Sequence, residues 1–503
     1  MASIEELHAA QAANGVVLYA LQQSNTINHV ASLVCCKYRP LPYLKVTLMS
    51  QHTHDPAILN GPIPGTFVRY MIPSILGLMA ITTASVVDGI FVGQFVSAEG
   101  LAAINLLIPY LSLLFGLALM IAIGGAVRAG HYLGEGNHSD ASGLMGLCLV
   151  AITIIALAFM IMSLLAGTHI LRFLGTPDSL LPLIQPYFRI ISAVLVLQTL
   201  TMVLYYFIRL DGGQRLATTA LTIGALANIL LDALLIIVFE MGLLGAAFAT
   251  AVSQTVQLII LSGFFLRKQR RLQLQFPWSR WRQLIKVAFN GLSELANEIS
   301  AGVVILVLNL ILVKQLGVEG VAAFAVVNYL IFVSLMLYYG IADALHLLTS
   351  QNHGAGQFLR IQGFVRSALT MVLIVSASIT ALLLIWPEKV SGMFISDASE
   401  DVLLLSAAYI SLVWPLFVIN GVNVTLAIYL TAMQQPVPSM LIALSRGLVL
   451  PVGLLLILSA LLPQPLFMVA LPIAEWLTFI LASLLFWQYR PLHRRWQKTK
   501  NAA

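Results

Sequence analysis

Residues 226–239 read LANILLDALLIIVF, a run of apolar side chains that contains one asparagine, Asn228, and one aspartate, Asp232. Similar runs recur along the chain, because 59% of its residues are hydrophobic and only 9% are charged. This composition lies far outside the range of water-soluble globular proteins. A run of about 20 apolar residues is long enough to cross the ~30 Å hydrocarbon core of a bilayer as a helix. The sequence therefore predicts an all-α integral membrane protein.

Twelve apolar runs are long enough to span a bilayer, so we predict twelve transmembrane helices. Their expected positions are 66–95, 100–130, 141–167, 180–210, 216–239, 242–266, 284–316, 320–350, 361–387, 399–432, 437–462 and 464–489. Tryptophans flank several of these ends, as interfacial aromatic residues do; they are Trp278, Trp281, Trp487 and Trp496. We expect the lipid bilayer to surround most of the chain.

Basic residues account for the formal net charge of +6, and they are concentrated in the predicted loops and tail. The densest runs are RKQRR at 267–271 and RPLHRRWQKTK at 490–500. Six predicted helices separate these runs, so both lie on one side of the membrane, which the positive-inside rule makes cytoplasmic. Nucleic acid would require a continuous basic face instead. We expect a multi-pass protein of the cell inner membrane, with both termini cytoplasmic and no nucleic-acid partner.

The two halves of the chain repeat each other. EGLAA at 99–103 matches EGVAA at 319–323, and GEG at 134–136 matches GAG at 354–356. Because this offset spans six helices, an even number, the halves share one orientation and are related by a pseudo-two-fold axis along the membrane normal. The expected divisions are a poorly ordered amino-terminal extension at 1–60, an amino-terminal six-helix lobe at 61–266, a basic cytoplasmic loop at 267–283, a carboxy-terminal six-helix lobe at 284–489 and a basic cytoplasmic tail at 490–503.

The amino-terminal segment differs from the rest of the chain. It has no sustained apolar span and lacks the order of regions found in a signal peptide. A second methionine, Met49, precedes the first predicted span. We expect residues 1–48 to be dispensable, either as an extension or as the product of an over-long start; the alternative is a regulatory arm.

Three stretches carry a resemblance to a known family. They are VDGIFVGQF at 87–95 followed by EGLAAINLLIP at 99–109, NILLDALLI at 228–236 followed by GLLGAAFATAVSQ at 242–254, and GIADALHLLTSQNHGAGQFLRI at 340–361. Over roughly residues 61–490 the chain resembles the multidrug and toxic compound extrusion (MATE) family, in its prokaryotic branch related to the DNA-damage-inducible transporter. The resemblance implies two six-helix lobes around a central cavity, and export of drugs or metabolites against an inward flow of protons or sodium ions. The chain departs from the family pattern at Val96, Asp343 and His346.

Oxygen-bearing side chains in the first lobe share one depth. At 1.5 Å per residue, Asp88, Asp232 and Thr250 lie about 25–28 Å from the predicted inner face, and Asn228 precedes Asp232 by one helical turn. Buried polar groups can simply hold helices together, but two ionised carboxylates repel, so they must share a proton or a cation. We therefore predict a coupling-cation site for a proton or a sodium ion at these four residues, with Pro73 as a possible hinge in the first helix.

The second lobe has its own polar residues. Glu294 and Glu298 are four residues apart in one predicted helix, and Asp343 and His346 are three apart in the next. We predict that these four line the substrate cavity; a solvated helix end for the glutamates and simple packing for His346 are the alternatives. Arg446 is expected to extend toward the membrane interface or to pair with a carboxylate.

Function follows from what the motifs include and exclude. The chain contains no H-E-x-x-H, G-x-S-x-G, G-x-x-x-x-G-K-[ST] or C-x-x-C motif, so we do not expect an enzyme or a cofactor. The prediction is a monomeric secondary antiporter that exports small amphipathic, cationic organic compounds in exchange for protons or sodium ions. A lipid-linked sugar or lipid flippase is the main alternative, and a channel is another; the acidic cavity residues favour cation chemistry over phosphate binding.

Overall fold

The computed structural model describes residues 56–386 and 400–491 of the chain. Most of these residues lie in helices. Within these ranges, twelve helices are long and apolar enough to cross a membrane. The predicted number of spans is therefore confirmed. A helix satisfies its backbone hydrogen bonds internally, which is what the interior of a bilayer demands of a membrane-spanning segment.

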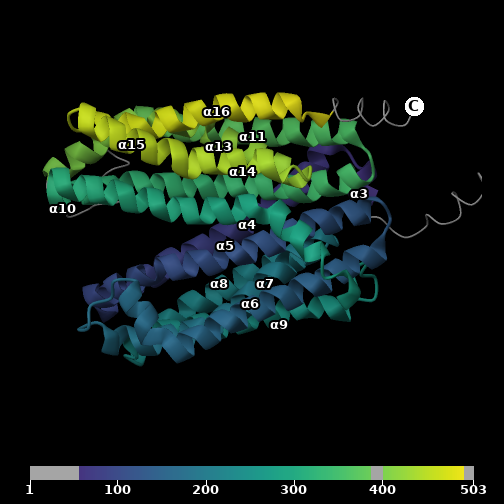
Figure 1. The fold of residues 1–503 in the computed structure, drawn as a ribbon, viewed down its shortest axis with the longest axis horizontal. Helices are drawn as coiled ribbons and strands as arrows, with labels where there is room; N and C mark the ends of the chain where they lie inside the picture. The colour runs from purple at the N-terminus through teal and green to yellow at the C-terminus, as the bar shows by residue number, and fades with distance from the viewer. Residues whose placement is uncertain (1–55, 387–399, 492–503) are drawn as a thin grey trace, which may run out of the picture. The chain divides into compact units, whose positions relative to one another are not determined.

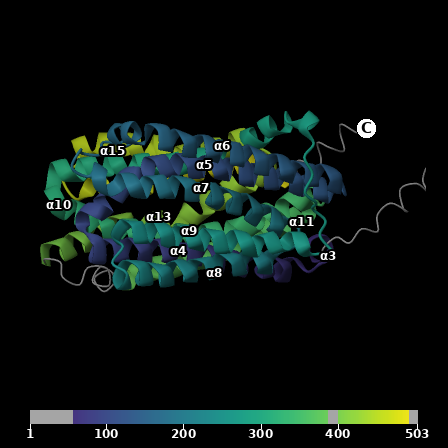
Figure 2. The same cartoon turned by 90° about the horizontal axis from the view of Figure 1, so that it is seen from below.

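The first lobe comes from the amino-terminal half of the described chain. Its elements are α4 (Ile63–Phe91), η1 (Val92–Val96), α5 (Ala98–Gly134), α6 (His138–Phe173), α7 (Leu181–Leu210), α8 (Gln214–Asp232), η2 (Ala233–Val238), α9 (Gly242–Ser262) and η3 (Gly263–Leu266). Seen from below, α4, α8 and α9 lie together on one side of this lobe, and α5, α6 and α7 lie on the other (Figure 2). The helices that carry the predicted cation-site residues are therefore neighbours.

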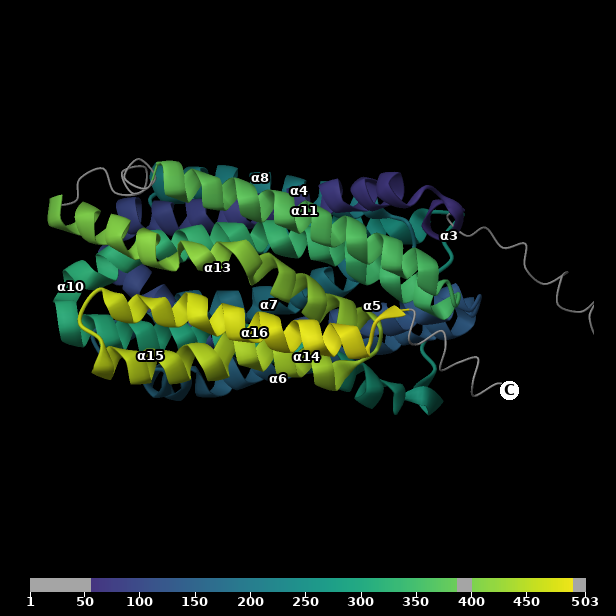
Figure 3. The ribbon, with the colours of Figure 1, turned by 90° about the horizontal axis from the view of Figure 1, so that it is seen from above.

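The second lobe follows a linker that contains the short helix η4 (Trp278–Arg280). Its elements are α10 (Gln283–Gly354), α11 (Phe358–Ile385), α13 (Glu400–Ala432), α14 (Pro436–Leu444), η5 (Ser445–Val449), α15 (Leu450–Leu461), η6 (Leu466–Val469) and α16 (Ala470–Gln488). From above, α13 lies between α11 and α16 (Figure 3). The two spans predicted at 284–316 and 320–350 both fall in α10. This helical run folds back on itself, as shown by the hydrogen bond from Asn297 Nδ2 to Tyr339 Oη at 2.6 Å.

The lobes meet along α5 and α10, where the sequence repeat becomes a structural one (Figure 1). A Cβ atom on Gly134 would lie 2.1 Å from the carbonyl oxygen of Gln351, and one on Gly354 would lie 2.0 Å from the carbonyl oxygen of His131. These reciprocal contacts join positions that the repeat makes equivalent. The structure thus agrees with the predicted two-lobe architecture and its pseudo-two-fold axis.

The turns after α5 and α10 repeat as well. Gly136 has φ +80° and Gly356 has φ +69°, a left-handed conformation that ends helices and favours glycine. In each turn, the backbone N–H of the residue after the glycine donates a hydrogen bond to a carbonyl group in the last turn of the helix. Asn137 N donates to Tyr132 O, and Gln357 N donates to Asn352 O, both at 2.8 Å. The GEG and GAG motifs are therefore matching helix caps at one end of the bundle.

The linker between the lobes is bound to the first lobe over most of its length. The Asp211 carboxylate accepts from the backbone N–H and from Nε of Arg271, each at 2.9 Å. Further along, Gln273 N donates to Ser142 Oγ at 3.0 Å, and Arg280 forms an ion pair with Asp140. We call the end of the bundle that carries this linker the linker end.

A short helix, α3 (Pro56–Asn60), also lies at the linker end. Its Ile58 is fully buried, and its carbonyl groups accept hydrogen bonds from the second lobe: Arg360 Nη2 donates to Ile58 O at 3.0 Å and Asn352 Nδ2 to the same oxygen at 3.3 Å. In the domain division predicted from the sequence, the residues of α3 belong to the amino-terminal extension at 1–60. Residues 1–55 of that extension, and residues 492–503 of the expected tail, lie outside the described residues.

Candidate functional site

The first-lobe aspartates occupy adjacent helices. Asp88 is half-buried near the end of α4, and Asp232 is the last residue of α8 and is fully buried. The two carboxylates are close enough to interact electrostatically. Neither oxygen of Asp232 has a hydrogen-bond partner among the described residues, and neither does Oδ1 of Asp88. Because an unpaired buried carboxylate is costly, this arrangement favours a proton or a bound cation.

The other predicted ligands flank this pair. Asn228 is buried one turn before Asp232 on α8. Thr250 lies on α9, which packs against α8, and its hydroxyl donates to Ala246 O of its own helix at 3.0 Å, which leaves its lone pairs for other contacts. Where the chain is described, no group of three or more His, Cys, Asp or Glu residues could hold a metal ion. A sodium ion here would thus need amide or hydroxyl oxygens as well, and the four-residue site remains a prediction.

Two features around the aspartates were not predicted from the sequence. Buried Tyr187 on α7 interacts electrostatically with both carboxylates. In addition, π-helical segments follow both residues: η1 begins four residues after Asp88, and η2 begins immediately after Asp232. Single π-turns within helices occur often at functional sites, and their register shift has no clear sequence signal.

A cavity of about 310 Å³ lies inside the second lobe. This volume is at the lower end of the range for small-molecule pockets. Most of its lining is apolar, and the charged members of the lining are Glu298 on α10, Arg446 on η5 and Glu475 on α16. The cavity therefore has the size and the mixed polarity of a site for an amphipathic organic molecule.

Glu475, which was not among the predicted site residues, anchors a polar network in the cavity wall. Arg446 Nε lies 3.2 Å from Glu475 Oε1, and both side chains are about nine-tenths buried. Asn420 Nδ2 donates to Oε1 at 2.7 Å, and Asn423 Nδ2 donates to Oε2 at 2.6 Å. Arg446 thus pairs with a carboxylate, one of the two alternatives expected for it. The sequence signal that could have identified Glu475 is its position as the single acidic residue in the apolar run at 470–488.

The four residues predicted to line one substrate cavity lie in three places. Glu298 lines the large cavity, and Glu294 lines a separate space of about 20 Å³. Asp343 and His346 line another space of about 20 Å³ between the lobes, near the linker end. Each of these smaller spaces is large enough for a water molecule only.

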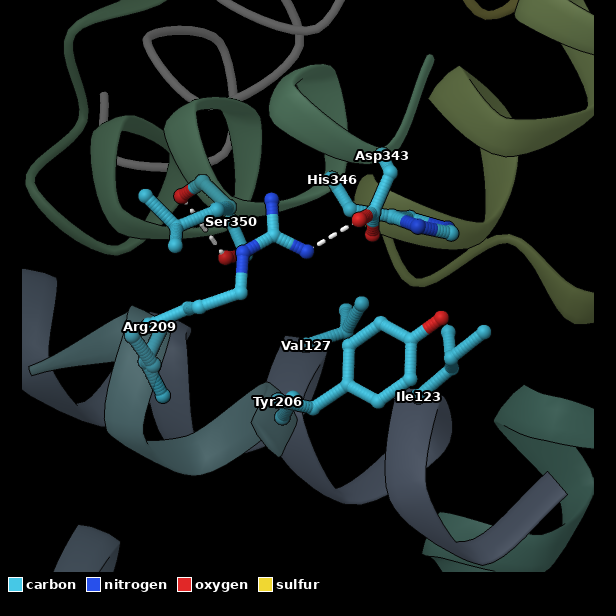
Figure 4. Close-up of a pocket in the computed structure, with 10 residues that line it drawn as sticks. Ile123, Val127, Tyr206, Arg209, Asp343, His346 and Ser350 are labelled. Carbon is cyan, nitrogen blue, oxygen red and sulfur yellow. Dashed lines mark hydrogen bonds and ion pairs between the residues drawn. The ribbon is translucent and has the colours of Figure 1, made fainter. Parts of the chain in front are cut away.

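Asp343 forms an ion pair with Arg209 of the opposite lobe, with side-chain exposures of 8% and 1% (Figure 4). The Arg209 guanidinium also donates to three first-lobe groups: Ser74 Oγ at 2.5 Å, Tyr205 Oη at 3.0 Å and Gln214 Oε1 at 2.9 Å. Pairing across 134 residues of sequence could not be inferred from periodicity. The pair joins α7 to α10 and holds the two lobes together at this end.

Pro73, the predicted hinge, lies within α4. The helix runs through it from Ile63 to Phe91, and Thr218 Oγ1 donates to the Pro73 carbonyl at 3.1 Å. A proline removes one backbone hydrogen bond, so this point of α4 stays the natural place for bending. The hinge role remains a prediction, because α4 is described in one conformation.

Comparison with known proteins identifies the family. The MatE family model matches residues 73–234 and 301–457, one segment in each lobe. The chain belongs to the MATE family. The resemblance carried by the three sequence stretches is thereby confirmed, and this MATE protein is a multi-pass membrane transporter rather than an enzyme.

Individual relatives cover most of this MATE transporter. The FAD transporter of Shewanella oneidensis is 26% identical over 409 residues, 77% of this chain and 86% of that protein. The multidrug export protein MepA of Staphylococcus saprophyticus is 21% identical over 425 residues, 84% of this chain and 93% of that protein. A solved outward-facing multidrug resistance MATE transporter has a TM-score of 0.81 at 21% identity, covering 90% of this chain and 100% of that one. At that identity, the structural match supports the fold.

Proposed function

We propose that this MATE protein is a secondary active antiporter that exports small amphipathic, cationic organic compounds in exchange for protons or sodium ions. Asp88 and Asp232 bind the coupling cation, with Asn228 and Thr250 as further ligands when the ion is sodium. The second-lobe cavity, with Glu298 in its lining, receives the substrate. The protein works as a monomer in the cell inner membrane, with its basic linker and both termini in the cytoplasm.

One observation carries the coupling role: both carboxylate oxygens of Asp232 are buried, lack a hydrogen-bond partner among residues 56–386 and 400–491, and lie beside a second carboxylate. A structural carboxylate in a membrane interior would normally be paired or hydrogen-bonded, as Glu475 is. Asp232 instead gains its counter-charge when a cation enters. Coupling requires only that cation and substrate prefer different conformations of the lobes.

The test is export of a fluorescent monocation, rhodamine 6G, from proteoliposomes with proton and sodium gradients imposed separately. Asp88→Asn and Asp232→Asn should each abolish gradient-driven accumulation, while Asp178→Asn, which alters an exposed acid of the same lobe, should leave it intact. The proposal fails if both site variants, folded and present in the membrane, still concentrate rhodamine 6G at the wild-type rate.

The relative named as a FAD transporter supports a second candidate, export of a dinucleotide. The pyrophosphate of such a substrate needs cationic partners, yet Arg446 in the cavity wall is already paired with Glu475. Cavity polarity therefore favours a cationic substrate. Loading the same proteoliposomes with FAD distinguishes the two candidates, since gradient-driven FAD efflux would favour the dinucleotide.

A further inference from the structure

The charge of the second-lobe cavity depends on an internal pair. One guanidinium, Arg446, and two carboxylates, Glu298 and Glu475, are the charged groups of its lining. One negative charge is therefore left over. Which carboxylate provides that charge is decided by the contacts of Arg446.

Glu475 is the carboxylate that balances Arg446. Its Oε1 accepts from Arg446 and from Asn420, and its Oε2 accepts from Asn423, so donors on two other elements hold both oxygens. Such a network fixes the carboxylate in place, because it satisfies each oxygen with a short hydrogen bond. The positive charge of Arg446 is thereby neutralised within the wall.

Arg446 is itself held at this position. It lies in the π-helical segment η5. The residue after it in the same segment, Gly447, also lines the cavity. A Cβ atom on Gly447 would lie 2.8 Å from Ser300 Cβ on α10, so η5 packs closely against that helix. The guanidinium therefore has little freedom to leave Glu475 for a ligand.

Glu298 is left as the unbalanced charge. Its side chain is half-buried, and no described residue donates a hydrogen bond to its carboxylate or forms an ion pair with it. The nearby cavity wall is largely hydrocarbon, which strengthens the attraction of a carboxylate for a cation relative to water. An amphipathic monocation can place its charge at Glu298 and its apolar body against the remaining wall.

We infer that the Arg446–Glu475 pair determines the charge selectivity of the cavity: by neutralising the guanidinium, it makes the site select organic monocations through Glu298 and exclude organic anions. This inference rests on the proposed function, because it concerns the cavity assigned to the substrate. Without Glu475, the same cavity would present an unpaired guanidinium to its ligands. Its selectivity would then shift toward anions.

The test measures binding, which needs no ion gradient. The full chain in nanodiscs is titrated with a monocation, rhodamine 6G, and a monoanion, 1-anilinonaphthalene-8-sulfonate, and fluorescence gives a dissociation constant for each. Glu475→Gln should weaken rhodamine 6G binding and tighten anion binding, changing their ratio by at least about tenfold, the effect of one charge-assisted hydrogen bond. Arg446→Gln should shift the ratio the opposite way.

A double variant separates charge from structure. Arg446→Gln combined with Glu475→Gln leaves Glu298 as the charged group of the lining, so it should restore the wild-type ratio. Glu298→Gln should weaken rhodamine 6G binding without any gain for the anion. The inference is overturned if Glu475→Gln keeps the wild-type ratio, or if the double variant behaves like that single variant.

These outcomes are distinct from failure of the proposed function. A wild-type protein that shows the expected binding ratios but no gradient-driven export would overturn the antiporter proposal and leave the selectivity role standing. Conversely, gradient-driven export with unchanged ratios in all variants would remove the selectivity role alone. If Glu475→Gln does not fold, the opposite shift expected for Arg446→Gln and the restored ratio in the double variant still decide the question.

Discussion

Replacing Asp343 with asparagine should open the linker end of the bundle. Removing one partner of a buried ion pair costs about 3–5 kcal/mol. We expect a value near the lower limit, because the 1%-exposed Arg209 keeps three neutral partners in its own lobe: Ser74, Tyr205 and Gln214. Since 1.4 kcal/mol is tenfold in an equilibrium constant, the closed arrangement should lose on the order of 10²-fold against one in which water reaches Arg209.

Cysteine labelling reports this opening. Ser350 lines the same inter-lobe space and is 1% exposed, so a cysteine there should react slowly while the lobes are closed. Ser350→Cys is introduced into a chain whose native cysteines are replaced by alanine, and its reaction with a hydrophilic maleimide is timed in nanodiscs. Adding Asp343→Asn should accelerate that reaction on the order of 10²-fold, in proportion to the population of the open form.

Two controls make the result specific. Asp178→Asn removes the same charge from the Arg172–Asp178 pair, whose side chains are 57% and 76% exposed, and should change the rate little. Combining Asp343→Asn with Arg209→Gln removes both charges and should bring back slow labelling. The reasoning is refuted if Asp343→Asn labels no faster than its parent, or if the double variant labels as fast as the single one.

Three further predictions concern other parts of the chain. Thr250→Ala should raise the sodium concentration for half-maximal export about tenfold if Thr250 binds sodium directly, whereas Thr255→Ala, an exposed position on the same helix, should not. Gly134→Ala should lower the melting temperature, since its Cβ would meet Gln351 O and overpacking costs about 1–3 kcal/mol; Gly302→Ala, with open space around it, should not. A chain that begins at Met49 should insert and export normally, while deletion of α3 should reduce stability; loss of export in the shorter chain at normal membrane levels would instead reveal a functional arm.

The membrane architecture could be predicted because it depends on local signals. Apolar length fixes each span, and the GEG and GAG repeats fix the relation between the lobes, where Gly134 and Gly354 meet. Counting residues along each span also predicted that Asp88 and Asp232 share one depth, since a transmembrane helix rises by a constant amount per residue, and the structure places the two on adjacent helices. These features required no knowledge of which helix contacts which.

The rest depends on contacts between distant helices. The sequence predicted that Asp343 lines the substrate cavity, but its partner Arg209 comes from the other lobe, and a position along a helix does not show which neighbour a side chain faces. Glu475 escaped attention because its neighbours in sequence are apolar; its meaning comes from Arg446 and the asparagines of α13. The π-helical segment after Asp232 rotates the side chains that follow it, and a regular spacing of 3.6 residues per turn does not predict this change of direction.

The docked linker has a practical consequence for measuring motion. From Arg271 to Arg280 it is bound to the first lobe, while α10 begins at Gln283, so only a few residues separate a segment carried by one lobe from a helix of the other. A fluorophore placed on the linker would report displacement of the first lobe, not of a slack tether. For the same reason, a split-protein version with two separately expressed lobes should be divided just before Gln283, which leaves the linker attached to its own binding surface.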